Sequence, residues 1–312
     1  MIKNIIKKTP IPTGGLALGL ASLGNLLHPF SEIAHWVCGT ASCLLLLLLI
    51  IKCVIYPKMI REDLHNSIFA SVGATSTMAA MVLATYFVDL NYWASFLFWC
   101  CAVVVHFVMM TFFIARYFPR FDLTEVFPTY FIAFVGVAVV GLTSPDFAAE
   151  IVGLVAFWVA LVGYAITLVL VTLRYIKHPV PEGANPLFCI YAAPSNLLLA
   201  TFFALDLQNH LFLVEILLIS GQFFLIMVCV KAWRFLFYKF YPSFAAMTFP
   251  FVITAISLTK SISYFAEQGA SARLLDFLHS VSIAETALAF LLVVYVFIRY
   301  IIFFATNNKT VQ

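Results

Sequence analysis

The chain has 312 residues, of which 64% are hydrophobic and 10% are charged, and its formal net charge is +3. A soluble globular protein carries about 25% charged residues, so this chain cannot cover its surface with polar groups and must expose most of it to lipid. Its apolar runs lack the roughly ten-residue alternation of barrel strands, which leaves an all-α integral membrane protein as the predicted fold class.

Apolar runs of about 20 residues, the length of one membrane crossing, predict ten transmembrane helices in a single domain covering residues 1–312. In chain order the expected spans are 13–28, 33–57, 66–88, 92–117, 128–144, 148–176, 188–206, 210–239, 245–266 and 272–304. Polar or proline-containing breaks separate most of them, including residues 57–63 and 178–186. The first run carries several glycines and leads into no convincing cleavage site, so we interpret it as a retained helix.

The distribution of Lys and Arg predicts the orientation of these spans. With the N-terminus inside, all of the 17 cationic residues except Lys260 and Arg273 fall on the cytoplasmic side, from Lys3 through to Lys309. Cytoplasmic loops of membrane proteins are enriched in Lys and Arg. We therefore expect both termini to lie in the cytoplasm.

The spans form five hairpins, each a shorter helix followed by a longer one, repeated about every 53 to 62 residues. The shorter members contain small or helix-weakening residues, among them Gly15 and Gly19, Gly73, Gly136, Pro194 and Pro250. Weakened backbone is tolerated at membrane depth where protein or a watery cavity covers it, although glycine also serves ordinary helix packing. Its recurrence in all five hairpins favours a quasi-fivefold arrangement, with the shorter helices lining a central pore.

Two motifs resemble a known family. Pro12-Thr13-Gly14 followed by residues 18–23 resembles the opening of bacterial TehA, and Thr248-Phe249-Pro250 resembles the matching segment of TehA and of the plant guard-cell slow anion channels. Length, spans and hairpin repetition agree across essentially the whole chain. The sequence thus resembles the tellurite-resistance/dicarboxylate transporter family.

This resemblance implies a homotrimer in the bacterial inner membrane, in which each protomer has its own pore. It implies passive conduction of small monovalent anions such as chloride or nitrate, with Phe249 as an aromatic gate. Relatives often carry kinking prolines in several inner helices, and here only Pro194 and Pro250 suit that role. Ala17, Ala74 and Ala133 stand at other such positions, where nearby glycines would do the bending.

Candidate anion contacts are hydroxyl and amide groups of the shorter helices, together with backbone N–H groups beside Gly and Pro. The side chains are Ser71, Thr75, Thr77, Ser195, Asn196 and Thr254. Each hydroxyl could instead bond to its own helix backbone. No charged residue falls deep in a shorter helix, and His106 and Glu285 fall in longer ones, where we expect packing contacts. Without an obvious proton relay, a channel is favoured over a pump.

The alternative within the same resemblance is a secondary transporter of dicarboxylates, sulfite or tellurite-related oxyanions. An enzyme is not supported, because no catalytic or phosphate-binding motif occurs. The seven cysteines lie in apolar runs without metal-ligand spacing, so we expect neither metal nor cofactor. The expected partners are small inorganic anions and the lipid bilayer, and no nucleic acid.

Overall fold

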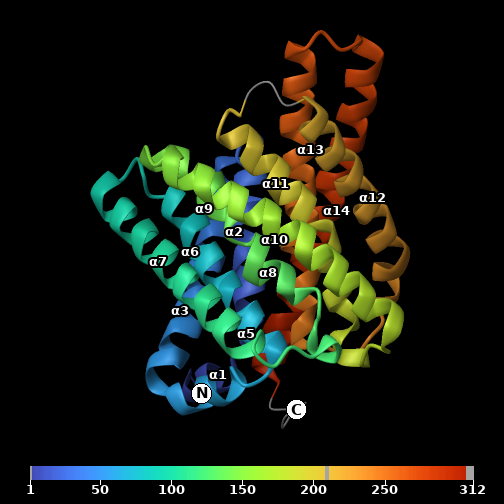
Figure 1. The fold of residues 1–312 in the computed structure, drawn as a ribbon. Coiled ribbons are helices and arrows are strands. Elements are labelled where there is room, and N and C mark those ends of the chain that lie inside the picture. The colour runs from blue at the N-terminus through green and yellow to red at the C-terminus, as the bar shows by residue number, and fades with distance from the viewer. Residues whose placement is uncertain (1, 208–210, 307–312) are drawn as a thin grey trace.

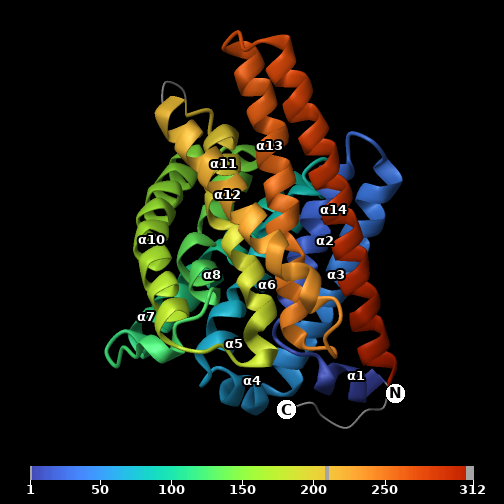
Figure 2. The ribbon, with the colours of Figure 1, turned by 90° about the vertical axis from the view of Figure 1, so that its right-hand side faces the viewer.

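The computed structural model describes residues 2–207 and 211–306, and every regular element within them is helical. Residue 210, where the eighth span was expected to begin, and Lys309 lie outside these ranges. The first helix, α1 (Ile2–Lys8), lies beside the end of the last one, since the Lys8 ammonium donates a hydrogen bond to the Thr306 carbonyl at 3.2 Å. Figure 2 shows this end of the bundle at the bottom of the view. The all-helical fold is as predicted.

Five buried segments form the interior of the bundle (Figure 1). They are α2 (Thr13–Leu27); α5 (Ser67–Val72) with α6 (Ala74–Thr85); α8 (Thr129–Val135) with α9 (Ala138–Thr143) and η2 (Ser144–Phe147); the 3-10 helix η3 (Glu182–Ala192) with α11 (Pro194–Ala204); and η4 (Pro242–Met247) with α13 (Phe249–Glu267). In α2, all residues except Asn25 and Leu27 are buried. In three of the other segments, 78% to 89% of the most apolar stretch is buried.

Five longer helices form the exterior. They are α3 (Glu32–Ile55), α7 (Tyr92–Tyr117), α10 (Glu150–Lys177), α12 (Leu211–Phe235) and α14 (Ala272–Ala305). Only 28% to 33% of the most apolar stretch of each is buried. Helices that are apolar all round and yet mostly uncovered need lipid around them. The five longer helices are therefore the lipid-facing layer, and the five buried segments are the layer that they enclose.

The inner segments contact one another in a closed ring. Contacts join α2 to α6, α6 to α9, α9 to α11, α11 to α13, and α13 back to α2. Each outer helix packs on the inner segment of its own hairpin and on the next inner segment, as α3 does on α2 and α6. The remaining short elements are α4 (Pro57–Asp63) and η1 (Leu123–Glu125), which lie in connections.

The described residues contain eight helices long and apolar enough to cross a membrane, or nine when the bent pair of α8 and α9–η2 is counted as one span. The remaining predicted span corresponds to α2, whose 15 residues extend for about 23 Å, short of the roughly 30 Å hydrocarbon core. The chain is therefore a multi-pass helical protein, and the count of ten crossings stays a prediction.

The inner segments are interrupted partway along their length. Gly73 separates α5 from α6, a 53° bend follows α8, Pro194 begins α11, and Pro250 stands in the first turn of α13. Proline removes an N–H donor and bends or ends a helix. At Pro194 and Pro250 the helix therefore lacks one backbone donor in the interior of the bundle.

The expected breaks at residues 57–63 and 178–186 both separate spans, but part of each is helical. Residues 57–63 form α4, because Pro57 takes the first helical position, where no N–H donor is needed. Residues 182–186 belong to η3, which begins before Pro186 rather than after it. In a 3-10 helix the missing Pro186 N–H leaves the Gly183 carbonyl free, and the Ser243 hydroxyl of η4 donates to that carbonyl at 2.5 Å.

Candidate functional site

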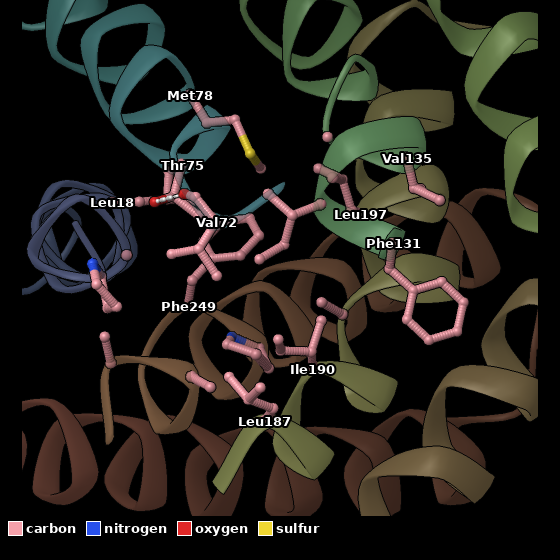
Figure 3. Close-up of a pocket in the computed structure, with 18 of the residues that line it drawn as sticks. Leu18, Val72, Thr75, Met78, Phe131, Val135, Leu187, Ile190, Leu197 and Phe249 are labelled. Carbon is pink, nitrogen blue, oxygen red and sulfur yellow. Dashed lines mark hydrogen bonds between the residues drawn. The ribbon is translucent and has the colours of Figure 1, made fainter. Parts of the chain in front are cut away.

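A small cavity of about 50 Å³ lies where the interrupted inner segments meet (Figure 3). All five inner segments contribute to its wall. Its lining comprises Pro12, Gly15, Leu18, Val72, Thr75, Met78, Phe131, Ile132, Val135, Gly136, Leu187, Ile190, Ala193, Pro194, Leu197, Ser243, Ala245, Ala246, Phe249 and Pro250. A space of this size holds only a few water molecules, since each needs about 10–15 Å³.

The lining residues follow a regular pattern along the chain. Stripes with a three-residue step begin at Pro12, Val72, Ile132, Leu187 and Ser243, about 55 to 60 residues apart. In η3 and η4 this step follows from the 3-10 helix, whose three residues per turn align every third side chain on one face. The cavity therefore receives an equivalent stripe from each repeat of the chain.

Phe249 is the aromatic side chain that α13 contributes to this wall. It is the first residue of α13 and only 6% exposed. Figure 3 shows it among the lining side chains, with Leu18, Val72 and Thr75 on one side and Leu187 and Ile190 on the other. Phe251, two residues on, is also buried but does not line the cavity.

The backbone at Phe249 is held by α2. The preceding residue, Thr248, has φ −108° and ψ −85°, outside the helical region. Its hydroxyl donates to the carbonyls of Ala245 at 2.7 Å and Gly15 at 3.1 Å. Gly19 makes this approach possible, because a Cβ there would lie 2.5 Å from the Thr248 side chain. Gly15 and Gly19 of α2 thus hold Thr248 in place, and Thr248 in turn positions the Phe249 ring.

The cavity is almost entirely apolar, and none of the described residues lining it is charged. Its two hydroxyls belong to Thr75 and Ser243, and each donates within the protein, to the carbonyls of Val72 at 2.7 Å and Gly183 at 2.5 Å. Only their lone pairs are left, and a lone pair accepts a hydrogen bond but does not attract an anion. An anion in this space would have to replace much of its hydration shell with weak contacts.

The structure places the predicted kink residues at two kinds of position. Gly15, Gly136, Pro194 and Pro250 line the cavity. Gly73 does not line it: a Cβ there would lie 2.8 Å from the terminal methyl of Met109 on α7, so it serves the contact between α6 and α7. Gly19, as described above, serves the contact between α2 and Thr248.

The predicted anion contacts lie mostly outside the cavity, and Thr75 is the one that lines it. The Ser71 hydroxyl donates to the Ser67 carbonyl of its own helix at 2.7 Å. The Thr77 hydroxyl lies 2.7 Å from Nδ1 of His106, and the Ser195 hydroxyl lies 2.7 Å from that of Tyr164 on α10. Thr77 and Ser195 thus connect inner segments to outer helices, whereas Ser71 does not.

Asn196 and Thr254 form a buried polar cluster with Ser257 between α11 and α13. The Asn196 amide donates to the Ala192 carbonyl at 2.7 Å and to the Thr254 hydroxyl at 3.0 Å. Its side-chain oxygen accepts from Ser257 at 2.8 Å. Gly221 of α12 leaves the room that the amide occupies, since a Cβ there would lie 2.4 Å from that oxygen.

His106 and Glu285 are buried in the outer helices α7 and α14, away from the cavity. Among the described residues, neither oxygen of Glu285 has a hydrogen-bond donor, and Nε2 of His106 has no partner. Lys260 is exposed near the far end of α13. No group of three side chains suited to a metal ion occurs in the part of the chain that the structure describes.

Sequence reasoning missed the bulky apolar side chains of the wall, such as Leu18, Met78, Ile190 and Leu197. It concentrated on glycine, proline and hydroxyl groups, whereas most of the wall is aliphatic. The signal that could have found them is the three-residue step from Pro12 and from Val72. That step identifies the residues that face the cavity only when the positions of the 3-10 turns and helix interruptions are known.

Helices that expose apolar surface outside and enclose a cavity inside define a multi-pass membrane protein of the channel and transporter class. The chain belongs to the voltage-dependent anion channel family, whose family model matches residues 9–301. This match confirms the family resemblance seen in the first and ninth predicted spans. Anion transport is thus the activity of the family. No curated protein matches the chain in sequence.

Proposed function

We propose that this protein is a passive channel for small monovalent anions such as chloride or nitrate, and that its pore runs through the ring of inner segments. The observation that supports this most is the cavity itself, to which all five inner segments contribute and into which Phe249 projects. Family membership indicates that the transported ion is an anion. The cavity indicates where the path is closed.

The proposal includes the arrangement around the pore. Ten crossings form five hairpins with quasi-fivefold symmetry, both termini lie in the cytoplasm, and three protomers, each with its own pore, assemble in a bacterial inner membrane. The closed ring of inner contacts supports the fivefold arrangement, and the Lys8–Thr306 bond supports termini on one side of the membrane. The trimer and the bacterial inner membrane follow only from the family resemblance. In it, α2 crosses as a short helix covered by α3, α6, α13 and α14.

Selectivity would then come from weak contacts rather than from a fixed charge. A permeant ion must bind well enough to enter and weakly enough to leave. Backbone N–H groups beside Gly136, Pro194 and Pro250 would supply weak donors, and the Thr75 hydroxyl would do so on turning away from the Val72 carbonyl. Such a pore favours poorly hydrated anions, because it cannot replace a tight hydration shell.

Phe249 would close the pore by filling it with an apolar ring. A narrow apolar constriction loses its water, and an ion cannot cross it without paying for desolvation. Because Phe249 follows a residue with non-helical backbone angles, a change at Thr248 would redirect the ring. Opening then needs only local movement of the start of α13.

The test is the anion current of the Phe249→Ala variant in proteoliposomes. We expect a current at least about tenfold above that of the unsubstituted protein, since the substitution removes the ring from the constriction. Phe251→Ala is the matched control, because it deletes an equally large buried ring of the same helix that does not line the cavity. Equal currents for the two variants would remove Phe249 from the role of gate.

The same preparation separates a channel from a carrier. A channel current reverses at the equilibrium potential of the anion, whether or not a pH gradient is present. A proton-coupled carrier of dicarboxylates, sulfite or tellurite-related oxyanions would shift its reversal potential with the pH gradient. In that event Glu285 and His106, both buried and incompletely paired, become the first residues to substitute.

A further inference from the structure

A second pocket, of about 330 Å³, opens between α4 and the end of α7, at the end of the molecule that carries α1. Figure 2 shows α4 lying across this end of the bundle, beneath α5. The pocket shares no lining residue with the cavity inside the ring. It lies beside the point where α3 and α7 leave the hydrophobic part of the protein.

The sequence of α4 and the residue after it builds one wall. Pro57, Ile60, Arg61 and Leu64 stand at positions i, i+3, i+4 and i+7, which fall on one face of a helix, and all four line the pocket. The Tyr117 hydroxyl of α7 donates to the Leu64 carbonyl at 2.9 Å. This bond fixes the end of α4 against α7.

The pocket gathers positive charge. Arg61 of α4 and Arg116 of α7 line it from opposite sides, together with His65. The His65 ring donates through Nδ1 to the Arg61 carbonyl at 2.7 Å, which holds the ring against α4. Both arginines are exposed, and neither forms an ion pair among the described residues.

The nearby acidic residues do not neutralise this charge. Asp63 lies 3.6 Å from the Lys52 ammonium, on the side of α4 away from the pocket, and Lys52 also donates to the Thr9 carbonyl at 2.8 Å. Glu62 is not part of the lining. Arg61 and Asp63 are two residues apart, about 200° around the helix, so the pocket faces the cations alone.

Apolar surface continues from the pocket along the membrane-facing helices. Phe112 lines it and is 42% exposed, and Val54 at the end of α3 is 75% exposed. A ligand that fits must therefore have an anionic group for the arginines and an apolar part for this surface. A free inorganic anion satisfies only the first requirement.

We propose that this pocket binds an anionic phospholipid of the adjoining leaflet, with the phosphate between Arg61 and Arg116 and an acyl chain against Phe112 and Val54. Guanidinium groups bind phosphate through paired N–H donors. Basic pockets at the ends of membrane helices are suited to anionic headgroups. The lipid connects α4 to α7 and so stabilises the contact made by Tyr117.

The test uses the full chain in detergent with defined lipid added. Thermal unfolding and native mass spectrometry are measured with phosphatidylglycerol, phosphatidylcholine or inorganic phosphate, for the unsubstituted protein and for the Arg61→Gln, Arg116→Gln double variant. We expect phosphatidylglycerol alone to raise the unfolding temperature, and the double variant to bind it about tenfold more weakly. Arg61→Gln alone and Lys58→Gln form the matched pair, because each removes one charge from α4 and Lys58 lies outside the lining.

Three outcomes would overturn the proposal. Equal stabilisation by phosphatidylcholine would show that charge is not recognised, and equal stabilisation by inorganic phosphate would show that the lipid is not. An equal loss of binding in Lys58→Gln would reduce the effect to general surface charge. If the double variant does not fold, the comparison of the three additives on the unsubstituted protein still tests the proposal. The proposal is then contradicted if phosphatidylglycerol raises the unfolding temperature no more than the other two additives do.

Discussion

Gly19 shows how a single hydrogen atom in place of a side chain sets the position of the proposed gate. A Cβ at Gly19 would lie 2.5 Å from the Thr248 side chain and 3.1 Å from the Phe249 nitrogen. A Cβ at Gly15, one turn earlier in α2, would meet Ala245 at 3.4 Å, a tight but tolerable contact. A methyl group at Gly19 would therefore disrupt the packing of α2, whereas a methyl group at Gly15 would not.

We predict that Gly19→Ala lowers the free energy of unfolding by about 1–3 kcal/mol, the usual cost of overpacking. It should also raise the basal anion current, because Thr248 and Phe249 must move away from α2. Gly15→Ala should change stability little, since helix propensity offsets the close contact. Thermal unfolding in detergent and current in proteoliposomes measure both effects. A stable, silent Gly19→Ala would contradict this account of the Thr248 contact.

At the scale of the element, η3 and η4 hold each other through a bond that replaces one lost to proline. The Gly183 carbonyl, left free by Pro186, accepts from the Ser243 hydroxyl of the next inner segment. Ser243→Ala should therefore destabilise the protein by about 0.5–1.5 kcal/mol, the net contribution of one hydrogen bond, because this bond is only partly buried. Ser280→Ala is the control, since the Ser280 hydroxyl bonds to the Asp276 carbonyl on an exposed turn of α14. Equal unfolding temperatures for the two variants would refute this role.

The same pair of elements shows what the sequence could and could not predict. The outer helices follow from uninterrupted apolar length, so their predicted limits agree with the structure to within a few residues. The sequence places the start of η3 too late because Pro186 indicates a break. The helix can include Pro186 because the distant Ser243 hydroxyl donates to the Gly183 carbonyl that Pro186 leaves without a donor. For the same reason, the distant partners of Thr77 and Ser195 could not be predicted, whereas the Ser71 hydroxyl bonds to its own helix, the alternative that the sequence offered. Phe249 was found through its motif, since aromatic residues are too common in this chain to single one out.

At the scale of the whole molecule, the proposed ten crossings place α4 and the tip of the α13–α14 hairpin on opposite sides of the membrane. Figures 1 and 2 show that tip at the far end of the bundle from α1. We predict that a membrane-impermeant thiol reagent added to intact cells labels Arg273→Cys and not Lys58→Cys. The unsubstituted protein, with its own seven cysteines, serves as the blank. Labelling of Lys58→Cys from outside would reverse the orientation, and labelling of both would change the number of crossings.

The central claim is that the ring of inner segments encloses the anion path, and cysteine block of the open variant tests it most directly. Leu18 lines the cavity, whereas Leu20, about 200° around α2, is buried elsewhere. Leu18→Cys and Leu20→Cys are each combined with Phe249→Ala, and the current is recorded before and after a small anionic thiol reagent. The account predicts that the current through the Leu18→Cys protein falls while that through the Leu20→Cys protein persists. An unblocked current in the Leu18→Cys protein would place the anion path outside the ring.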